Sequence, residues 1–104
     1  MPEQIVPNGK LMKYIESLYF VKVKDSNLFF HNVNGSALLL VGFEGAAFFD
    51  EKNAEKLVKV NKKLEAIKIV DLAKELPVVL SGFPKGHALY GAQVRVRDFT
   101  ITRN

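Results

Sequence analysis

The sequence predicts a mixed α+β fold that is mostly β. We expect a small five-stranded antiparallel barrel, or a strongly curved sheet, with one helical segment. Several segments alternate apolar and polar residues with the period of two that strands require. Asn34-Gly35 is a strong hairpin signal, because both central residues of a type I′ turn need positive φ. Residues 50–76 contain no Gly or Pro and carry most of the lysines, which favours a helix there.

The composition indicates one globular domain, residues 1–104, with 48% hydrophobic and 25% charged residues. The chain has no Cys, so disulfides, thiolate catalysis and cysteine-based zinc sites are excluded. No apolar run has the length of a membrane span. We therefore expect a soluble protein of a reducing, intracellular compartment, the cytoplasm, with no membrane partner. The net charge of +4 would favour a polyanionic partner without requiring one.

The N-terminal part of the chain predicts a loose arm followed by a helix. Residues 1–9 include Pro2 and Pro7 and are expected to be the arm. Asn8 can cap a short amphipathic helix. Its apolar positions recur three and four residues apart, at Leu11, Tyr14, Ile15 and Leu18.

Three strands should follow as a meander, at residues 19–24, 28–33 and 36–43. The third is almost entirely apolar, so we expect both of its faces to be covered. Residues 46–49 either continue this strand beyond a bulge or form a strand of their own.

The segment after Asp50, a plausible N-cap, predicts helix as far as Pro77. One long bent helix and two shorter helices that break near residues 61–65 fit equally well. Residues 58–60 and 67–69 could also be read as strand. The two apolar stripes that support a helix consist of Leu57, Val60, Leu64 and Ile67, and of Ile69, Leu72, Ala73 and Leu76.

The C-terminal part predicts a short strand at residues 78–80, a loop, and a long strand at residues 88–102. The apolar parity changes along the last strand, so a bulge or sharp bend is expected near Arg97-Asp98. The order of three strands, a helix and two strands is that of an OB-fold barrel, in which the helix plugs one end. The alternative is an open antiparallel sheet with the helix packed on one face.

A candidate nucleic-acid site follows from strand parity and from the arginines, all three of which lie between Val94 and Asn104. If the valines of the first and last strands face the core, the residues between them form outward rows. Rings in these rows would stack on bases, and the cations would neutralise phosphate. The predicted residues are Phe20, Lys22, Lys24, Phe30, Lys85, Tyr90, Arg95, Arg97 and Arg103. The alternative is a solvated sheet face, on which edge cations prevent aggregation.

The sequence carries no catalytic or metal-binding pattern. His31 and His87 are the only histidines, and neither has the spacing of a metal site. The loop at residues 81–87 resembles a phosphate cradle in composition, but its spacing matches no P-loop. In a barrel, Lys85, His87 and Tyr90 could still reach a ligand beside this loop. We therefore expect no cofactor and no enzymatic activity.

Two functional hypotheses follow, with a third behind them. The first is a small non-enzymatic domain that binds single-stranded DNA or RNA by stacking and charge. The alternative is a protein-interaction module, such as an accessory subunit, an inhibitor or an assembly protein, which could be a homodimer. Its interface would include residues 38–43 and 46–49, and exposed contiguous apolar area would favour it. A small enzyme or ligand carrier with a pocket in the barrel mouth is the third.

Overall fold

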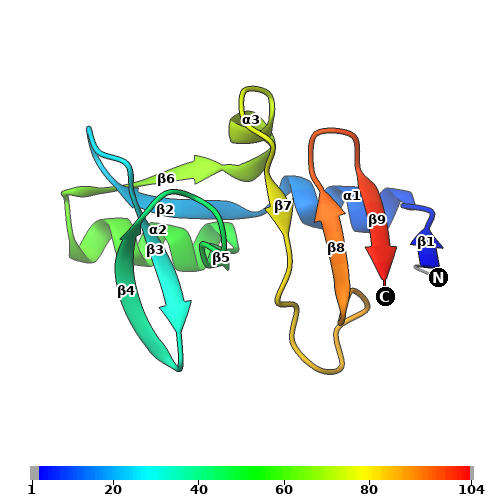
Figure 1. Cartoon of the computed structure of the whole chain (residues 1–104). Coiled ribbons are helices and arrows are strands. Elements are labelled where there is room, and N and C mark those ends of the chain that lie inside the picture. The colour runs from blue at the N-terminus through cyan, green and yellow to red at the C-terminus, as the bar shows by residue number, and fades with distance from the viewer. Residues whose placement is uncertain (1–2, 104) are drawn as a thin grey trace.

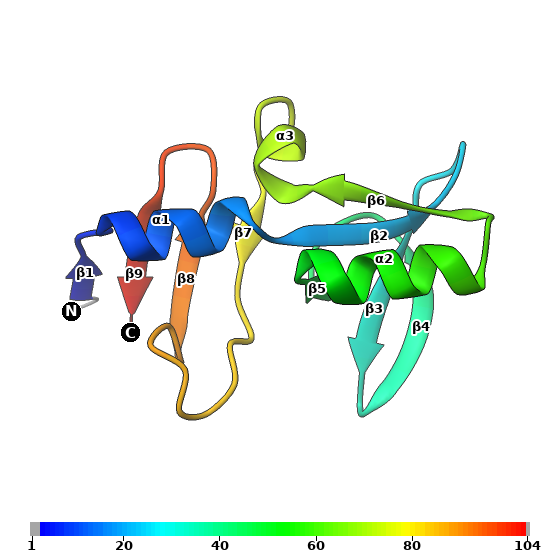
Figure 2. The ribbon, with the colours of Figure 1, turned by 180° about the vertical axis from the view of Figure 1, so that it is seen from behind.

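A computed structural model gives the structure of residues 3–103. Over this range the chain is α+β, with two antiparallel sheets that lie side by side. The two longer helices lie on one side of the sheets, behind them in Figure 1 and in front of them in Figure 2.

The terminal sheet joins the two ends of the chain in the strand order β1-β9-β8-β7. Its strands are β1 (Glu3–Ile5), β7 (Val79–Leu80), β8 (Ala92–Arg95) and β9 (Thr100–Arg103). The central sheet has the order β4-β3-β2-β5, and β6 also pairs with β2. Its strands are β2 (Tyr19–Val23), β3 (Leu28–Val33), β4 (Ser36–Val41), β5 (Phe48–Phe49) and β6 (Leu64–Lys68). The helices are α1 (Gly9–Glu16), α2 (Glu51–Val60) and α3 (Ile69–Ala73).

The expected barrel is wrong, because neither sheet of residues 3–103 closes on itself or on the other. Strand β6, which was expected to be helical, pairs along the whole of β2, from Tyr19↔Lys68 to Val23↔Leu64. The C-terminal strands pair with each other and with β1 instead of returning to the central sheet. The OB-like order of five strands and one helix therefore does not describe the fold.

The long helical segment splits at Asn61. Asp50 caps the start of α2 as expected, since its carboxylate accepts the amide of Asn53 at 2.8 Å. Asn61 leaves the helical conformation, and its side-chain oxygen accepts the amide of Lys63 at 3.0 Å. Such a local turn competes with the helix and reverses the chain toward β2.

The long C-terminal strand is instead a hairpin of β8 and β9 with a turn at residues 96–99. The change of parity near Arg97 was placed correctly, but it marks a chain reversal rather than a bulge in one strand. Val94 and Ile101 are cross-strand partners, and both are buried.

Part of the expected N-terminal arm belongs to the terminal sheet. Glu3 pairs with Arg103 and Ile5 pairs with Ile101, so residues 3–5 form an edge strand. Residues 1–2 of that arm lie outside the described residues. The cap on α1 was predicted correctly, since the Asn8 side chain accepts the amide of Leu11 at 2.9 Å.

Two apolar clusters flank the central sheet. The larger one lies between the two sheets and includes Phe20, Phe29 and Val94. The smaller one, which includes Val21 and Ala54, lies between β2 and α2. Because Phe20 and Val21 are neighbours on one strand, they point to opposite faces. Strand β2 is therefore buried on both of its faces.

Candidate functional site

The predicted contacts on β2 belong to the protein interior. Phe20 is 1% exposed, and its ring meets that of Phe29 edge to face with the ring centres 6.0 Å apart. The expectation that Phe20 faces solvent is wrong, because the larger apolar cluster, between the two sheets, covers that face of β2. The Lys22 ammonium lies 2.9 Å from the Glu65 carboxylate and also donates to the carbonyl of Ser26 at 3.0 Å. Neither side chain is presented to a ligand.

Phe30 and Lys24 are partly available. Phe30 is half-buried and meets the Phe49 ring edge to face, with the ring centres 5.9 Å apart. Lys24 is exposed beside a groove of about 490 Å³ between α2 and β6. Lys59 and Lys62 also line this groove. The carboxylates of Glu55 and Glu65 line the same groove, so its border carries both signs of charge.

Two of the three arginines hold backbone carbonyls. Arg97 donates from Nε to the carbonyl of Ala73 at 3.1 Å and from its terminal nitrogen to that of Lys74 at 3.5 Å. Arg103 donates in the same manner to the carbonyls of Tyr90, at 3.1 Å, and Ala88, at 2.6 Å. A guanidinium can bind two acceptors at once and an ammonium does so poorly, which explains why arginine stands at both positions.

The remaining predicted contacts are spread over the terminal sheet and its loop. Arg95 and Arg97 point away from the core, as parity predicted, while Val94 and Val96 are buried. Arg95 lies 3.7 Å from Asp98. The pKa of the Asp98 carboxyl is lowered by hydrogen bonding to Thr100 and, to a smaller extent, by Arg95. Lys85 is exposed in the loop and Tyr90 is 50% exposed. The nine predicted residues are thus divided between the two sheets and the turns and loops beside them.

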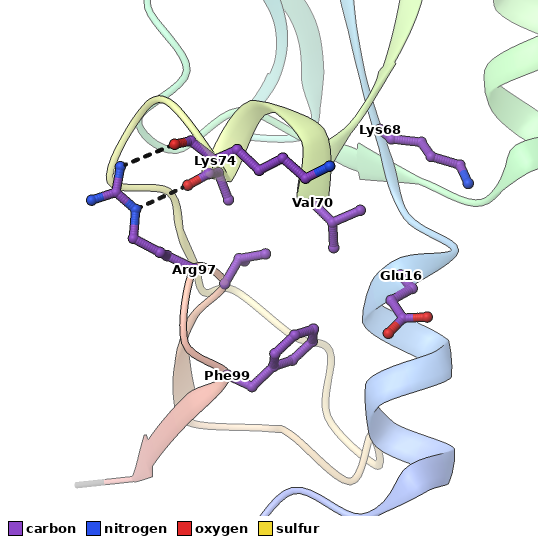
Figure 3. A pocket seen from close by; sticks show the side chains of 8 residues that line it. Glu16, Lys68, Val70, Lys74, Arg97 and Phe99 are labelled. Carbon is purple, nitrogen blue, oxygen red and sulfur yellow. Dashed lines mark hydrogen bonds between the residues drawn. The ribbon is translucent and has the colours of Figure 1, made fainter.

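A pocket of about 320 Å³ lies where α1, the end of β6, α3 and the β8–β9 turn meet (Figure 3). Phe99 points into it, and Lys68, Lys74 and Glu16 lie around its opening. Phe99 has a φ of 54°, which is uncommon for a bulky side chain. The guanidinium of Arg97 is turned away toward the carbonyls after α3. The pocket thus combines apolar lining residues with charged side chains of both signs.

Strand β4 is the most unusual surface of the described chain. It was expected to be covered on both faces, and that expectation is wrong, because all six of its residues are exposed. Leu38, Leu39, Leu40 and Val41 are 46%, 43%, 41% and 75% exposed. Within residues 3–103, β4 pairs only with β3 and ends the central sheet. Figure 1 shows it as the outer strand of a hairpin that extends away from β2.

The apolar residues of β4 lie on both faces of the sheet. Leu38 and Leu40 project from one face, and Leu39 and Val41 from the other, because strand side chains alternate. A partner that docked on one face would need an apolar stripe on that face alone. Apolar residues on both faces indicate instead a strand that continues into a neighbour in the plane of the sheet.

The turn determines which backbone groups of β4 point outward. Asn34 and Gly35 have φ values of 51° and 78°, as a two-residue type I′ turn requires. Val33 and Ser36, which flank this turn, are the first hydrogen-bonded pair, and such pairs alternate along an antiparallel ladder. The N–H and C=O groups of every second residue therefore face away from β3. These outward residues are Ala37, Leu39 and Val41.

The edge is also free of charge. No Lys, Arg, Asp or Glu occurs between Asp25 and Glu44. His31 on β3 is 5% exposed, and its Nε2 lies 2.9 Å from the carbonyl oxygen of Gly42, which ties the end of β4 to its neighbour. The charged side chains that natural edge strands use against strand pairing are thus absent here.

Within residues 3–103, no group of three or more His, Asp or Glu side chains could hold a metal ion. None of the helices described is long and apolar enough to span a membrane. Comparisons with protein-family models, with curated proteins and with solved structures gave no match.

Proposed function

We propose that the chain is a protein-interaction module that binds another polypeptide by strand addition at the β4 edge. The observation that carries the proposal is an uncharged strand with exposed leucines on both faces and outward N–H and C=O groups. Strand addition uses backbone hydrogen bonds for affinity and the side chains of alternate residues for specificity. The proposed role needs no catalytic group.

Burial of the exposed apolar side chains of β4 would supply part of the free energy of binding. The exposed parts of Leu38, Leu39, Leu40 and Val41 amount to about two whole side chains, and burying them would contribute roughly 3–6 kcal/mol. Loss of translational and rotational freedom on association costs about 4–15 kcal/mol. Apolar contacts from both partners and the new backbone hydrogen bonds must therefore act together. We expect a specific complex of modest affinity.

Binding of single-stranded nucleic acid is the competing prediction. It is supported by the net charge of +4 and by the groove that Lys24 shares with Lys59 and Lys62. It has less support than strand addition, because Phe20 is buried and Lys22 is paired with Glu65. The two proposals differ in salt dependence, since phosphate contacts weaken steeply with salt and apolar strand pairing does not.

The test uses a fluorescent peptide that carries the sequence of residues 36–41 between flanking lysines, and a labelled single-stranded oligonucleotide. Each is titrated with the chain in fluorescence anisotropy, at low and at near-physiological salt. We expect the peptide to bind at both salt concentrations and the oligonucleotide to bind weakly or not at all. Absence of peptide binding, with oligonucleotide binding that falls with salt, would overturn the proposal.

A further inference from the structure

We infer that the strand added at β4 is the β4 strand of a second copy of this chain, antiparallel to the first, with a two-fold axis at Leu39. The inference rests on the proposed function and names its partner. A two-fold dimer places the same surface on both sides of the interface, so the surface must be complementary to itself.

The outward hydrogen-bonding groups of the β4 backbone are complementary to those of a second copy. They pair more completely with the two-fold axis at Leu39 than with the axis one residue to either side. Because Ala37, Leu39 and Val41 carry the outward groups, a partner strand can pair only with these positions. With the axis at Leu39, Leu39 faces its own copy, and Ala37 faces Val41 of the second chain on either side. All three outward residues of each copy then form hydrogen bonds. A shift of the axis to Leu38 or Leu40 leaves one of the three outside the paired strands.

The side chains meet the requirement on both faces. In this register Leu38 stands opposite Leu40 of the second copy on one face, and Leu39 stands opposite Leu39 on the other. Opposed apolar side chains stabilise strand pairs, whereas like charges opposite each other destabilise them. The uncharged run between Asp25 and Glu44 places no like charges across the axis. An edge with one sign of charge would have indicated a different protein as the partner.

The size of the contact predicts a weak dimer. The smallest specific interfaces between proteins bury less than about 1,200 Å² of surface in total. An interface formed by one six-residue strand edge from each copy belongs to this class. The monomer and the dimer should therefore exchange at micromolar concentrations or above. The pairing would join the two central sheets into one continuous sheet.

The absence of Cys allows a direct test with single-cysteine variants of the full chain. Two residues opposed across a hydrogen-bonded antiparallel pair have Cα atoms about 5.5 Å apart, within the range of roughly 4.4–6.8 Å that a disulfide spans. A cysteine at position 39 would face the same cysteine of the second copy directly across the two-fold axis, at a distance that a disulfide can span. Position 38 meets its own copy only diagonally, at about 7–8 Å, and is the matched control. Val60 on α2, which is 86% exposed, supplies a remote control.

Under mild oxidation at high protein concentration, we expect L39C to form a disulfide-linked dimer several-fold faster than L38C or V60C. A faster reaction of L38C would overturn the register. Equal slow reaction of all three variants would overturn the pairing of two copies. If the β4 peptide nevertheless binds the chain in anisotropy, the strand-addition function stands and only the pairing of two folded copies fails. If neither the peptide nor the cysteine reports contact at β4, both fail together.

Discussion

Replacement of Leu39 by lysine should weaken self-association and leave the fold of the monomer intact. Leu39 is 43% exposed in the single chain and would stand opposite its own copy across the axis. Burial of the remaining surface of both Leu39 side chains contributes about 1.3–2.6 kcal/mol, and two opposed lysines would add repulsion. A loss near 2 kcal/mol corresponds to a dissociation constant roughly 30-fold higher.

Sedimentation equilibrium of wild type and Leu39→Lys over a wide range of concentrations measures this change. Val60→Lys is the matched control, because it places the same charge on an exposed apolar site far from β4. Circular dichroism and urea unfolding verify that each variant folds. We expect this because lysine is a natural residue of edge strands and favours helix at the exposed position 60. Equal dissociation constants for wild type and Leu39→Lys would refute the assignment of the interface to β4.

Three further outcomes follow from the packing. Phe20→Ala should lower the free energy of unfolding by about 3–5 kcal/mol, because it opens a cavity between the sheets; a smaller loss in urea unfolding, below about 1 kcal/mol, would contradict the burial of this ring. Arg103→Lys should lose one of two carbonyl contacts and about 1 kcal/mol of stability, seen as a lower thermal midpoint, whereas an unchanged midpoint would mean that Arg103 is not a structural residue. Burial, and to a smaller extent the charge of Asp50, raises the pKa of Tyr14. The folded state therefore favours the neutral phenol, and its contribution is present below the unfolded pKa of about 10 and declines as the pH rises above it. Wild type should lose stability relative to Tyr14→Phe on that alkaline side, and parallel unfolding midpoints for the two would contradict the raised pKa.

Much of the local structure could be predicted from the sequence, because its causes are local. The caps at Asn8 and Asp50 and the turn at Asn34-Gly35 depend on short-range chemistry, and all three were predicted correctly. The strands on either side of this turn were also predicted, at residues 28–33 as found and at residues 36–43, where the observed strand ends at Val41. These elements carry their own signals within a few residues.

The barrel was predicted wrongly because strand pairing over long distances decided the fold. Leu64–Lys68 contains Leu, Glu, Ala and Lys, which favour helix on their own, and it becomes a strand through its pairing with β2. The only local sign of the break was Asn61, whose side chain closes a turn. Tertiary pairing overrode local propensity here.

In the candidate site, too, local features were predicted and the packing of distant segments was not. An all-apolar strand predicts burial, and the sequence of β4 cannot by itself say whether its own chain or another chain covers it. The alternation of side chains along β8 predicted correctly that Arg95 points outward. The same reasoning treated one face of β2 as exposed to solvent, whereas Phe20 on that face is buried. The uncharged run around β4 was the signal that could have drawn attention to an edge.

Residue-resolved amide hydrogen exchange by NMR, at low and high protein concentration, tests the pairing of two copies at β4 most directly. The amides of Leu38 and Leu40 bond to β3 and should be protected at both concentrations. The amides of Ala37, Leu39 and Val41 should exchange fast when dilute and become at least several-fold slower when concentrated. If those three amides exchange fast at every concentration at which the chain is dimeric, β4 does not form the dimer interface.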